Sequence, residues 1–348
     1  MNPIFWRDRR VLLTGHTGFK GGWLAVWLAM LDARVHGYAL APATQPALFQ
    51  VARIETVLAT HTLADVRDPD ALTEVMARVA PEIVFHLAAQ PLVRESYRTP
   101  VDTFATNVMG TVHLLEAVRQ VPSVRAVVVI TSDKCYLNRE SGNAYVETDA
   151  LGGHDPYSAS KACAELATQA WRSAFLTDRV SVASARAGNV IGGGDWAEDR
   201  LVPDALRAWE KGRPVQVRYP GAVRPWQHVL EPLHGYLMLA ERLHGGEAAE
   251  AWNFGPDAHD MVPVGVLLDR LAQFWGAGAT WFGDAGSHPH EAGLLHLDSG
   301  KARRELGWVP RWSLDVALDR VVGWHRAFLG GEDMLRRCQV DIEDYQST

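Results

Sequence analysis

Two sets of polar side chains in the middle of the chain have the types and the spacing for proton transfer at an alcohol carbon. Tyr157 and Lys161 stand four residues apart, so on a helix they share one face. A nearby ammonium lowers the pKa of a phenol, and the resulting phenolate can act as a base near neutral pH. Hydroxyl, carboxyl and amine groups follow one another at Ser132, Asp133 and Lys134, where they could carry further proton transfers.

Each of these residues also has a plainer interpretation. A Tyr-x-x-x-Lys pair often arises by chance on exposed helices, Asp133 could be a helix cap or turn residue, and Lys134 could be a solvated charge. The catalytic interpretation of Tyr157 and Lys161 gains weight because the pair follows the predicted strand end at Ser132 at a suitable distance, in a chain that also carries a dinucleotide-binding pattern. The apolar run 127–130 predicts a strand that leads into Thr131, and Tyr157 belongs to a predicted helix.

A glycine-rich turn near the start of the chain could hold a cofactor against this group. The apolar strand 10–14 leads into Gly15, Gly18 and Gly21, and a buried helix is predicted over 22–31. Strand, glycine turn and helix form the context of a dinucleotide fingerprint, in which the pyrophosphate rests on the helix N-terminus. The pattern therefore predicts a bound dinucleotide.

Two polar residues inside the turn, and the strand that follows, leave alternatives open. His16 and Lys20 could contact the pyrophosphate or could be solvated loop residues. The next predicted strand, 34–40, ends without the acid that often binds the adenosine ribose, and without an arginine for a 2′-phosphate. The motif alone therefore does not choose between NAD and NADP.

Strands and helices alternate along the first half of the chain. Further strands are predicted over 60–67, 82–90 and 180–186, and helices over 70–79 and 100–118. This alternation predicts a doubly wound parallel sheet, whose ligands bind outside the carboxyl ends of the strands. The residues expected at that edge are Gly15 to Gly21, Asp65, Ala88 and Ser132 to Lys134.

The composition is that of a soluble globular protein. The chain has 348 residues, 47% of them hydrophobic, and a formal net charge of -7 at pH 7, which argues against nucleic acid as a general partner. Its three cysteines lack metal-ligand spacing, which favours a reducing compartment. No signal-peptide pattern opens the sequence, and the most apolar early stretch, 23–31, is too short to span a bilayer. We expect a cytoplasmic protein that binds neither nucleic acid nor membrane.

The glycine turn, Ser132 and Tyr157-x-x-x-Lys161 occur in the order typical of the extended short-chain dehydrogenase/reductases, which this chain resembles over nearly its whole length. Within that superfamily it is most similar to the sugar-nucleotide 4,6-dehydratases, and among these to the members that act on CDP-D-glucose. The motifs that carry the closer resemblance are 15–23 (GHTGFKGGW), 88–94 (AAQPLVR), 131–136 (TSDKCY), 186–196 (RAGNVIGGGDW), 224–229 (RPWQHV) and 288–292 (HPHEA). The related dTDP-glucose members carry Thr-Asp-Glu where this chain has Ser132, Asp133 and Lys134.

The resemblance implies an α/β fold with a doubly wound parallel Rossmann sheet and a second, smaller α/β substrate-binding lobe. It also implies dehydration of CDP-D-glucose to CDP-4-keto-6-deoxy-D-glucose, by transient C4 oxidation with bound NAD, loss of water across C5–C6 and return of the hydride to C6. Tyr157, with Lys161 and Ser132, would serve the oxidation. Asp133 would be the acid at the 6-hydroxyl, and Lys134 is the candidate base at C5.

The expected binding residues follow from the same resemblance. Those expected to contact NAD are Gly15, His16, Gly18, Phe19, Lys20, Gly21, Asp65, Val66, Leu87, Ala88, Ala89, Gln90, Asn107, Thr131, Tyr157 and Lys161. Those expected to contact the sugar nucleotide are Gln90, Val93, Asn189, Arg200, Arg218, Arg224, His290 and Glu291. Guanidinium groups suit a pyrophosphate, although Arg218 could equally belong to a surface cluster. No metal site is expected, because His288 and His290 have no evident third ligand.

The division into lobes and the assembly also follow from the resemblance. Residues 1–187 plus about 226–254 would form the dinucleotide-binding domain, and residues 188–225 plus about 255–348 the sugar-nucleotide-binding domain. The polar tail after Gly331 is expected to be peripheral. A homodimer or homotetramer is expected, formed through helices such as 100–118 and the helix of Tyr157.

Two other functions stay open. A sugar-nucleotide 4-epimerase of the same fold would need the oxidation step but no acid and base for water loss, and Asp133 and Lys134 are the feature against it. A non-catalytic dinucleotide sensor would not need the pair of Tyr157 and Lys161, which this chain retains.

Overall fold

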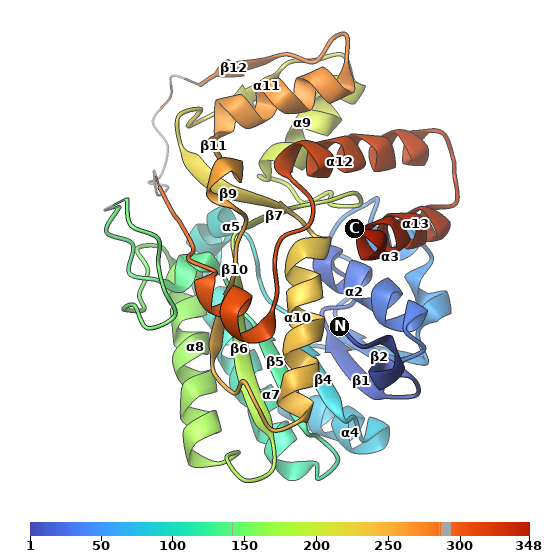
Figure 1. Ribbon diagram of the computed structural model, residues 1–348, viewed down its shortest axis with the longest axis vertical. Coiled ribbons are helices and arrows are strands. Elements are labelled where there is room, and N and C mark those ends of the chain that lie inside the picture. The colour runs from blue at the N-terminus through green and yellow to red at the C-terminus, as the bar shows by residue number, and fades with distance from the viewer. Residues whose placement is uncertain (141, 285, 287–293) are drawn as a thin grey trace.

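A seven-stranded parallel sheet forms the centre of the larger lobe (Figure 1). The computed structural model describes residues 1–140, 142–284, 286 and 294–348. The strands are β1 (Arg10–Thr14), β2 (Arg34–Ala39), β3 (Thr60–Leu63), β4 (Ile83–His86), β5 (Ala126–Ile130), β6 (Ser181–Ala187) and β10 (Ala251–Phe254). Their spatial order is β10-β6-β5-β4-β1-β2-β3, and all neighbours run parallel. The predicted doubly wound sheet is confirmed, and its order reverses between β1 and β4, where such sheets bind ligands.

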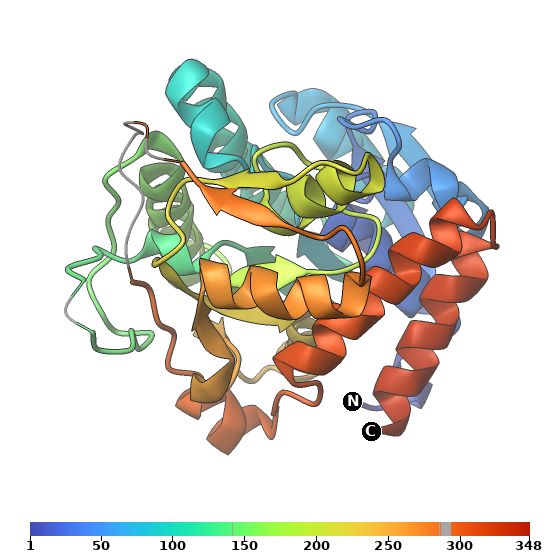
Figure 2. The ribbon, with the colours of Figure 1, turned by 90° about the horizontal axis from the view of Figure 1, so that it is seen from above.

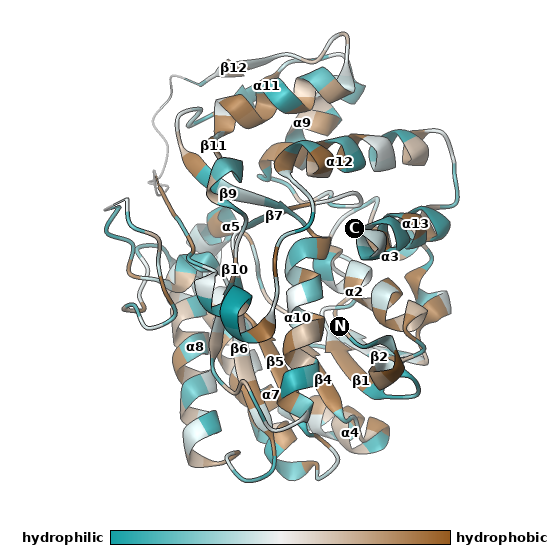
Figure 3. Cartoon of the chain, in the orientation of Figure 1, coloured by the Kyte–Doolittle hydropathy of each residue, from teal (hydrophilic) through white to brown (hydrophobic). Residues whose placement is uncertain are grey.

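Helices cover both faces of this sheet. On one face lie α2 (Phe19–Met30) and α10 (Leu230–His244), and on the other lie α4 (Pro69–Val79), α7 (Gly110–Gln120) and α8 (Pro156–Ala174). The central strands are largely apolar because both faces of the sheet are covered, as the burial of all five β5 residues illustrates. Figure 3 shows these hydrophobic strands between helices whose outer surfaces are more hydrophilic.

The helix predicted over 100–118 is divided into three consecutive helical segments. These are α6 (Pro100–Phe104), a π-helical segment (Ala105–Met109) and α7. A π-helical segment inside an α-helix is rare and often marks a functional site. The short helices elsewhere are α1 (Pro3–Trp6), α3 (Leu48–Val51) and α5 (Val93–Arg98), with 3-10 turns at Ile54–Val57, Asp133–Cys135 and Ala258–Asp260 and a second π-helical segment at Ala302–Leu306.

A smaller lobe lies beyond one end of the large sheet, as Figures 1 and 2 show. Its elements are β7 (Asn189–Ile191), α9 (Leu201–Glu210), β8 (Val215–Val217), β9 (Val223–His228), β11 (Met261–Pro263), α11 (Val264–Trp275), β12 (Trp281–Gly283) and α12 (Leu314–Leu329). Strand β9 pairs in parallel with β7 and antiparallel with β11, while β8 pairs with β12. A separate apolar core joins these elements, with Trp209 and Trp226 among its buried residues.

The C-terminal segment is not peripheral, contrary to the sequence-based expectation. It forms α13 (Met334–Ser347), which packs against α2, the helix that follows the glycine turn. Cys338, Ile342 and Tyr345 are fully buried in the core of the larger lobe. The segment is polar overall because one face of the helix is exposed, yet its apolar residues recur at helical spacing and form a buried stripe. Within the described ranges no helix is long and apolar enough to cross a membrane.

Candidate active site

The glycine turn is closed by contacts that admit no side chain. Gly15 has φ +77°, and a Cβ there would lie 2.8 Å from the backbone of Ala88. A Cβ on Gly21 would lie 2.1 Å from the Gly15 carbonyl oxygen. Helix α2 begins after Gly18 with no side chain capping its first amides, so these amides remain available to an anion. This cradle fits the pyrophosphate of a dinucleotide.

His16 and Lys20 occupy different environments within the turn. His16 is fully buried beneath Gly37 and against Phe49, and its Nε2 lies 3.1 Å from Nδ1 of His61, so the solvated alternative is wrong for it. Burial lowers the pKa of His16 to about 4, so this ring is neutral at pH 7. Lys20 is half-buried, and burial lowers its pKa to about 7, with Arg200 acting in the same direction.

The loop after β4 is held to the rest of the site by amide side chains. The Asn107 carboxamide accepts a hydrogen bond from the Gln90 amide at 2.8 Å and donates to Ser160 on α8 at 2.9 Å. The Gln90 side chain donates to Thr103 and to the Leu92 carbonyl. Asn107 lies in the π-helical segment and is buried there, as suits a segment type that often marks a functional site.

The other residues expected to contact NAD lie just after the carboxyl ends of β1, β3 and β4. The Leu87 and Ala88 amides both donate to the Thr14 hydroxyl, which fixes the end of β4 against β1. Leu87, Ala88 and Ala89 are half-buried, and Phe19 is half-buried on the first turn of α2. At the end of β3, Asp65 forms an ion pair with Arg67 at 2.6 Å, and Val66 packs beneath Gly110.

Ser132, Tyr157 and Lys161 meet where β5 ends. Tyr157 and Lys161 lie one turn apart on α8, and the Ser132 hydroxyl is close enough to the Tyr157 phenol to lower the pKa of that phenol. Burial raises the pKa of Tyr157 to about 12, so the expectation of a lowered phenol pKa is not met. The reason is that burial outweighs the neighbouring charges, and the Lys161 ammonium donates to the Ile130 carbonyl at 3.2 Å. Burial also lowers the pKa of Lys161 to about 8, and the negative charge of Glu165 opposes this shift.

Asp133 is a buried carboxyl group next to this pair. It is 2% exposed, and its Oδ1 accepts a hydrogen bond from the Ser132 hydroxyl at 3.0 Å. Its Oδ2 has no hydrogen-bond partner among the described residues, and Gly188 lies against it. Burial raises the pKa of Asp133, while the charges of Lys134, Arg224 and Lys20 lower it. A raised pKa favours a protonated carboxyl group that can donate a proton.

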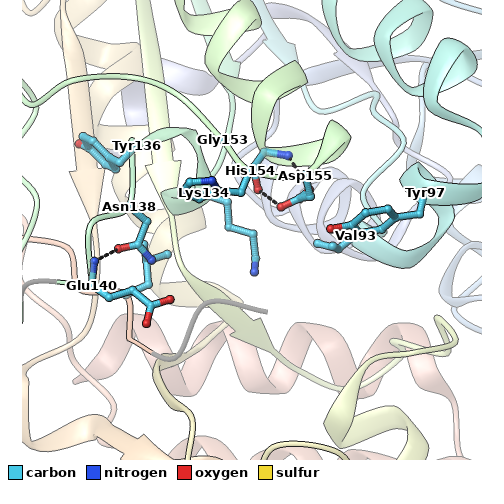
Figure 4. A pocket seen from close by; sticks show the side chains of 11 residues that line it. Val93, Tyr97, Lys134, Tyr136, Asn138, Glu140, Gly153, His154 and Asp155 are labelled. Carbon is cyan, nitrogen blue, oxygen red and sulfur yellow. Dashed lines mark hydrogen bonds between the residues drawn. The ribbon is translucent and has the colours of Figure 1, made fainter. Parts of the chain in front are cut away.

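Lys134 points into a cavity beside this group, as Figure 4 shows. The cavity is bounded by Val93, Tyr97, Lys134, Tyr136, Asn138, Glu140, Gly153, His154, Asp155, Ser158 and Leu295. Val93 was expected to contact the sugar nucleotide, and the structure places it on the same cavity as Lys134. The polar residues Tyr97, Asn138, Glu140 and His154 were not expected there from the sequence.

The remaining predicted substrate residues lie on the small lobe and on the loop that leads into it. Arg224, on β9, is buried and close enough to Asp133 to lower the pKa of that carboxyl group. Arg200 pairs with Asp195 at 2.8 Å, and its charge also acts on Tyr157. Asn189 is half-buried at the start of β7. His290 and Glu291 lie outside the described residues.

Asp199, which the sequence did not single out, forms ion pairs with two arginines near the predicted substrate residues. Asp199 lies 2.6 Å from Arg94 and 3.5 Å from Arg218, and so joins α5 to the segment after β8. Asp199 has φ +61°, a left-handed conformation that is uncommon for residues other than glycine. Neither its type nor its position in the loop could have indicated this contact from the sequence.

The chain resembles known proteins along its whole length. Residues 11–255 match the model of the NAD dependent epimerase/dehydratase family. The chain is 52% identical to CDP-glucose 4,6-dehydratase of Salmonella typhimurium, over 99% of this chain and 98% of that protein. It is 28% identical to dTDP-glucose 4,6-dehydratase of Neisseria gonorrhoeae, over 75% of this chain and 79% of that protein.

Solved structures show the same fold. UDP-glucose 4-epimerase of Thermotoga maritima superimposes with a TM-score of 0.79 at 22% identity, over 92% of this chain and 99% of that one. A double mutant of dTDP-glucose 4,6-dehydratase from Streptomyces venezuelae, solved with NAD bound, has a TM-score of 0.78 at 24% identity. The match covers 94% of this chain and 99% of that one.

Proposed function

Because the chain belongs to the NAD dependent epimerase/dehydratase family, we propose that it dehydrates CDP-D-glucose to CDP-4-keto-6-deoxy-D-glucose. Its cofactor is NAD. The observation that carries the proposal is the 52% identity to CDP-glucose 4,6-dehydratase, because that match extends over 99% of the chain and therefore over both lobes.

In this proposal the oxidation at C4 depends on Tyr157. NAD held by the glycine turn supplies reversible hydride transfer. Tyr157 removes the proton of the sugar 4-hydroxyl, and the neighbouring Ser132 hydroxyl would donate a hydrogen bond to the same sugar oxygen. The charge of Arg200 favours the phenolate once the phenol loses its proton. Because burial raises the pKa of Tyr157 to about 12, the phenol must first lose its own proton to water, and the phenolate then accepts the proton of the 4-hydroxyl.

Water loss across C5–C6 depends on the two residues after Ser132. The 4-ketone makes the C5 hydrogen acidic, and Lys134 is the candidate base that removes it. Asp133 is the candidate acid that protonates the departing 6-hydroxyl, which its raised pKa supports. Asp133 and Lys134 are adjacent in a single 3-10 turn, so one rigid segment would carry both groups.

The proposal also includes the binding surfaces. The larger lobe would hold NAD, while Arg224, Arg218 and Arg200 would hold the sugar nucleotide from the smaller lobe and the loop before it. A homodimer or homotetramer would form through α6 and the segment after it, where Val101 and Met109 are 80% and 46% exposed and line an apolar hollow. A cytoplasmic location remains part of the proposal.

One incubation separates the proposed activity from its rivals. The purified protein is mixed with NAD and CDP-D-glucose, with dTDP-D-glucose and UDP-D-glucose as parallel substrates. We expect the ultraviolet band of a 4-keto-6-deoxy sugar in alkali with CDP-D-glucose alone. A 4-epimerised sugar without that band would establish the epimerase instead. Turnover of another sugar nucleotide only would change the substrate, and no turnover of any would contradict the proposal.

A further inference from the structure

A second buried carboxylate, Glu165, lies behind the catalytic end of β5. It follows Lys161 by one turn of α8, so Tyr157, Lys161 and Glu165 lie along one face of the helix. Its side chain is only 3% exposed. One oxygen accepts a hydrogen bond from the Thr131 hydroxyl at 2.5 Å, and the other accepts from Ser184 at 2.7 Å.

Arg186 completes the environment of this carboxylate. Its guanidinium forms an ion pair with Glu165 at 2.7 Å, and it also donates to the Tyr136 hydroxyl at 2.7 Å. Burial raises the pKa of Glu165, but the hydrogen bonds and charge of Arg186 outweigh burial and bring that pKa below its usual value. Glu165 is therefore ionised at neutral pH, because its hydrogen-bond donors stabilise the charged form.

The contacts of α8 fix two successive residues of the catalytic strand end. Lys161 donates to the carbonyl of Ile130, and Glu165 accepts from the side chain of Thr131, the residue directly before Ser132. The position of Ser132 relative to Tyr157 therefore depends on the bond between Glu165 and Thr131. The Glu165 charge also opposes the effect of burial on Lys161.

We propose that Glu165 is a positioning residue of the active site, which keeps Lys161 positively charged and holds Ser132 in place through Thr131. The effect of Glu165 on the reaction rests on the proposed function, whereas its effect on the charge of Lys161 does not. The charge of Lys161 can be measured on the protein without substrate, so the two can fail separately.

The test uses the small number of lysines in the chain, which are Lys20, Lys134, Lys161, Lys211 and Lys301. Protein made with isotope-labelled lysine gives five signals to follow by NMR against pH, and Lys161→Arg identifies the signal of Lys161. We expect Glu165→Gln to move the titration of Lys161 downward by about one pH unit. Glu250→Gln is the matched control, because Glu250 pairs with Lys301 far from Lys161. It should leave the Lys161 signal unchanged. An unmoved Lys161 in folded Glu165→Gln protein overturns the proposal.

A second pair of variants covers the case in which Glu165→Gln does not fold, since it leaves Arg186 buried without its partner. Thr131→Val and Ser184→Ala each remove one hydrogen bond to Glu165 and keep every charge. Thr131→Val should lower the rate of dehydration about tenfold, because the bond next to Ser132 is lost. Ser184→Ala should lower it less, because Ser184 lies on β6, away from Ser132. Equal rates in the two variants would show that the Thr131 bond has no special role.

Discussion

Two buried carboxyl groups, Glu165 and Asp133, lie on opposite sides of the end of β5 and differ in the direction of their pKa shifts. They are similarly buried, at 4% and 2% exposure. Both oxygens of Glu165 accept hydrogen bonds, and its pKa is lowered. Asp133 has one oxygen with no partner among the described residues, and its pKa is raised.

The difference shows that burial alone does not decide the protonation of a carboxyl group. On the core side, three hydrogen-bond donors, one of them the guanidinium of Arg186, keep Glu165 ionised, so it can act as a fixed charge. Asp133 accepts a hydrogen bond from Ser132 only, and its other oxygen has no partner among the described residues, so it can gain and lose a proton. Groups of the second kind are the ones expected to take part in chemistry.

The largest effect is expected from Tyr157→Phe, which removes the phenol proposed as the base at the sugar 4-hydroxyl. Product formation from CDP-D-glucose should fall by about 10⁴-fold, because no base remains for the 4-hydroxyl proton. The alkaline ultraviolet assay measures this directly. NAD binding, followed by fluorescence, should remain and serves as the control for folding. A variant that still forms product at the normal rate would remove Tyr157 from the mechanism.

Asp133→Asn should give the next largest effect, because an amide cannot donate the proton that the departing 6-hydroxyl needs. Water loss should slow by about 10³-fold, while oxidation at C4 remains detectable as a transient rise in NADH absorbance. Asp257→Asn is the control, since Asp257 pairs with Arg303, in a segment that packs against α10 and β10. Dehydration at the normal rate in Asp133→Asn would remove Asp133 from the mechanism.

Lys134→Met tests the other member of the turn. It should slow exchange of the C5 hydrogen with deuterated solvent by about 10²-fold, because the candidate base is lost while the aliphatic stem is kept. Mass spectrometry of the recovered sugar nucleotide measures the exchange. Lys211→Met, at the exposed end of α9, should exchange normally. Normal exchange in Lys134→Met as well would assign the base to another residue.

The smallest effect is expected in the core, where His234→Phe should change stability but not activity. Burial lowers the pKa of His234 to about 3, and its ring stacks on Trp27. Between that value and the unfolded value of about 6.5, only the unfolded chain binds the proton, so stability is lost as the pH falls. Between about pH 8 and about pH 5, the free energy of unfolding of the variant should therefore fall by about 2 kcal/mol less than that of the wild type. Thermal unfolding at the two pH values measures this, and equal losses would contradict it.

The sequence predicted the parts of the fold that depend on local pattern. The strand, glycine turn and helix at 10–31 are present, and the alternation of strands and helices corresponds to the observed parallel sheet. The tail after Gly331 was mispredicted, because its buried stripe is narrow and its mean polarity is high. Asp199 and Glu165 could not be identified as parts of the site, since their partners are distant in the sequence and a single acidic residue carries no signal of its own.

By itself the sequence determined which groups stand at the strand end and on the facing helix, because residue type and helical spacing are properties of the local chain. The roles of Tyr157, Asp133 and Lys134 remain proposals that the variants above test. Only the tertiary structure decided how those groups are charged. Whether a buried carboxyl is ionised depends on the donors that other strands bring to it, and whether a phenol loses its proton depends on burial and on charges from other segments. Those partners are brought together only when the chain folds.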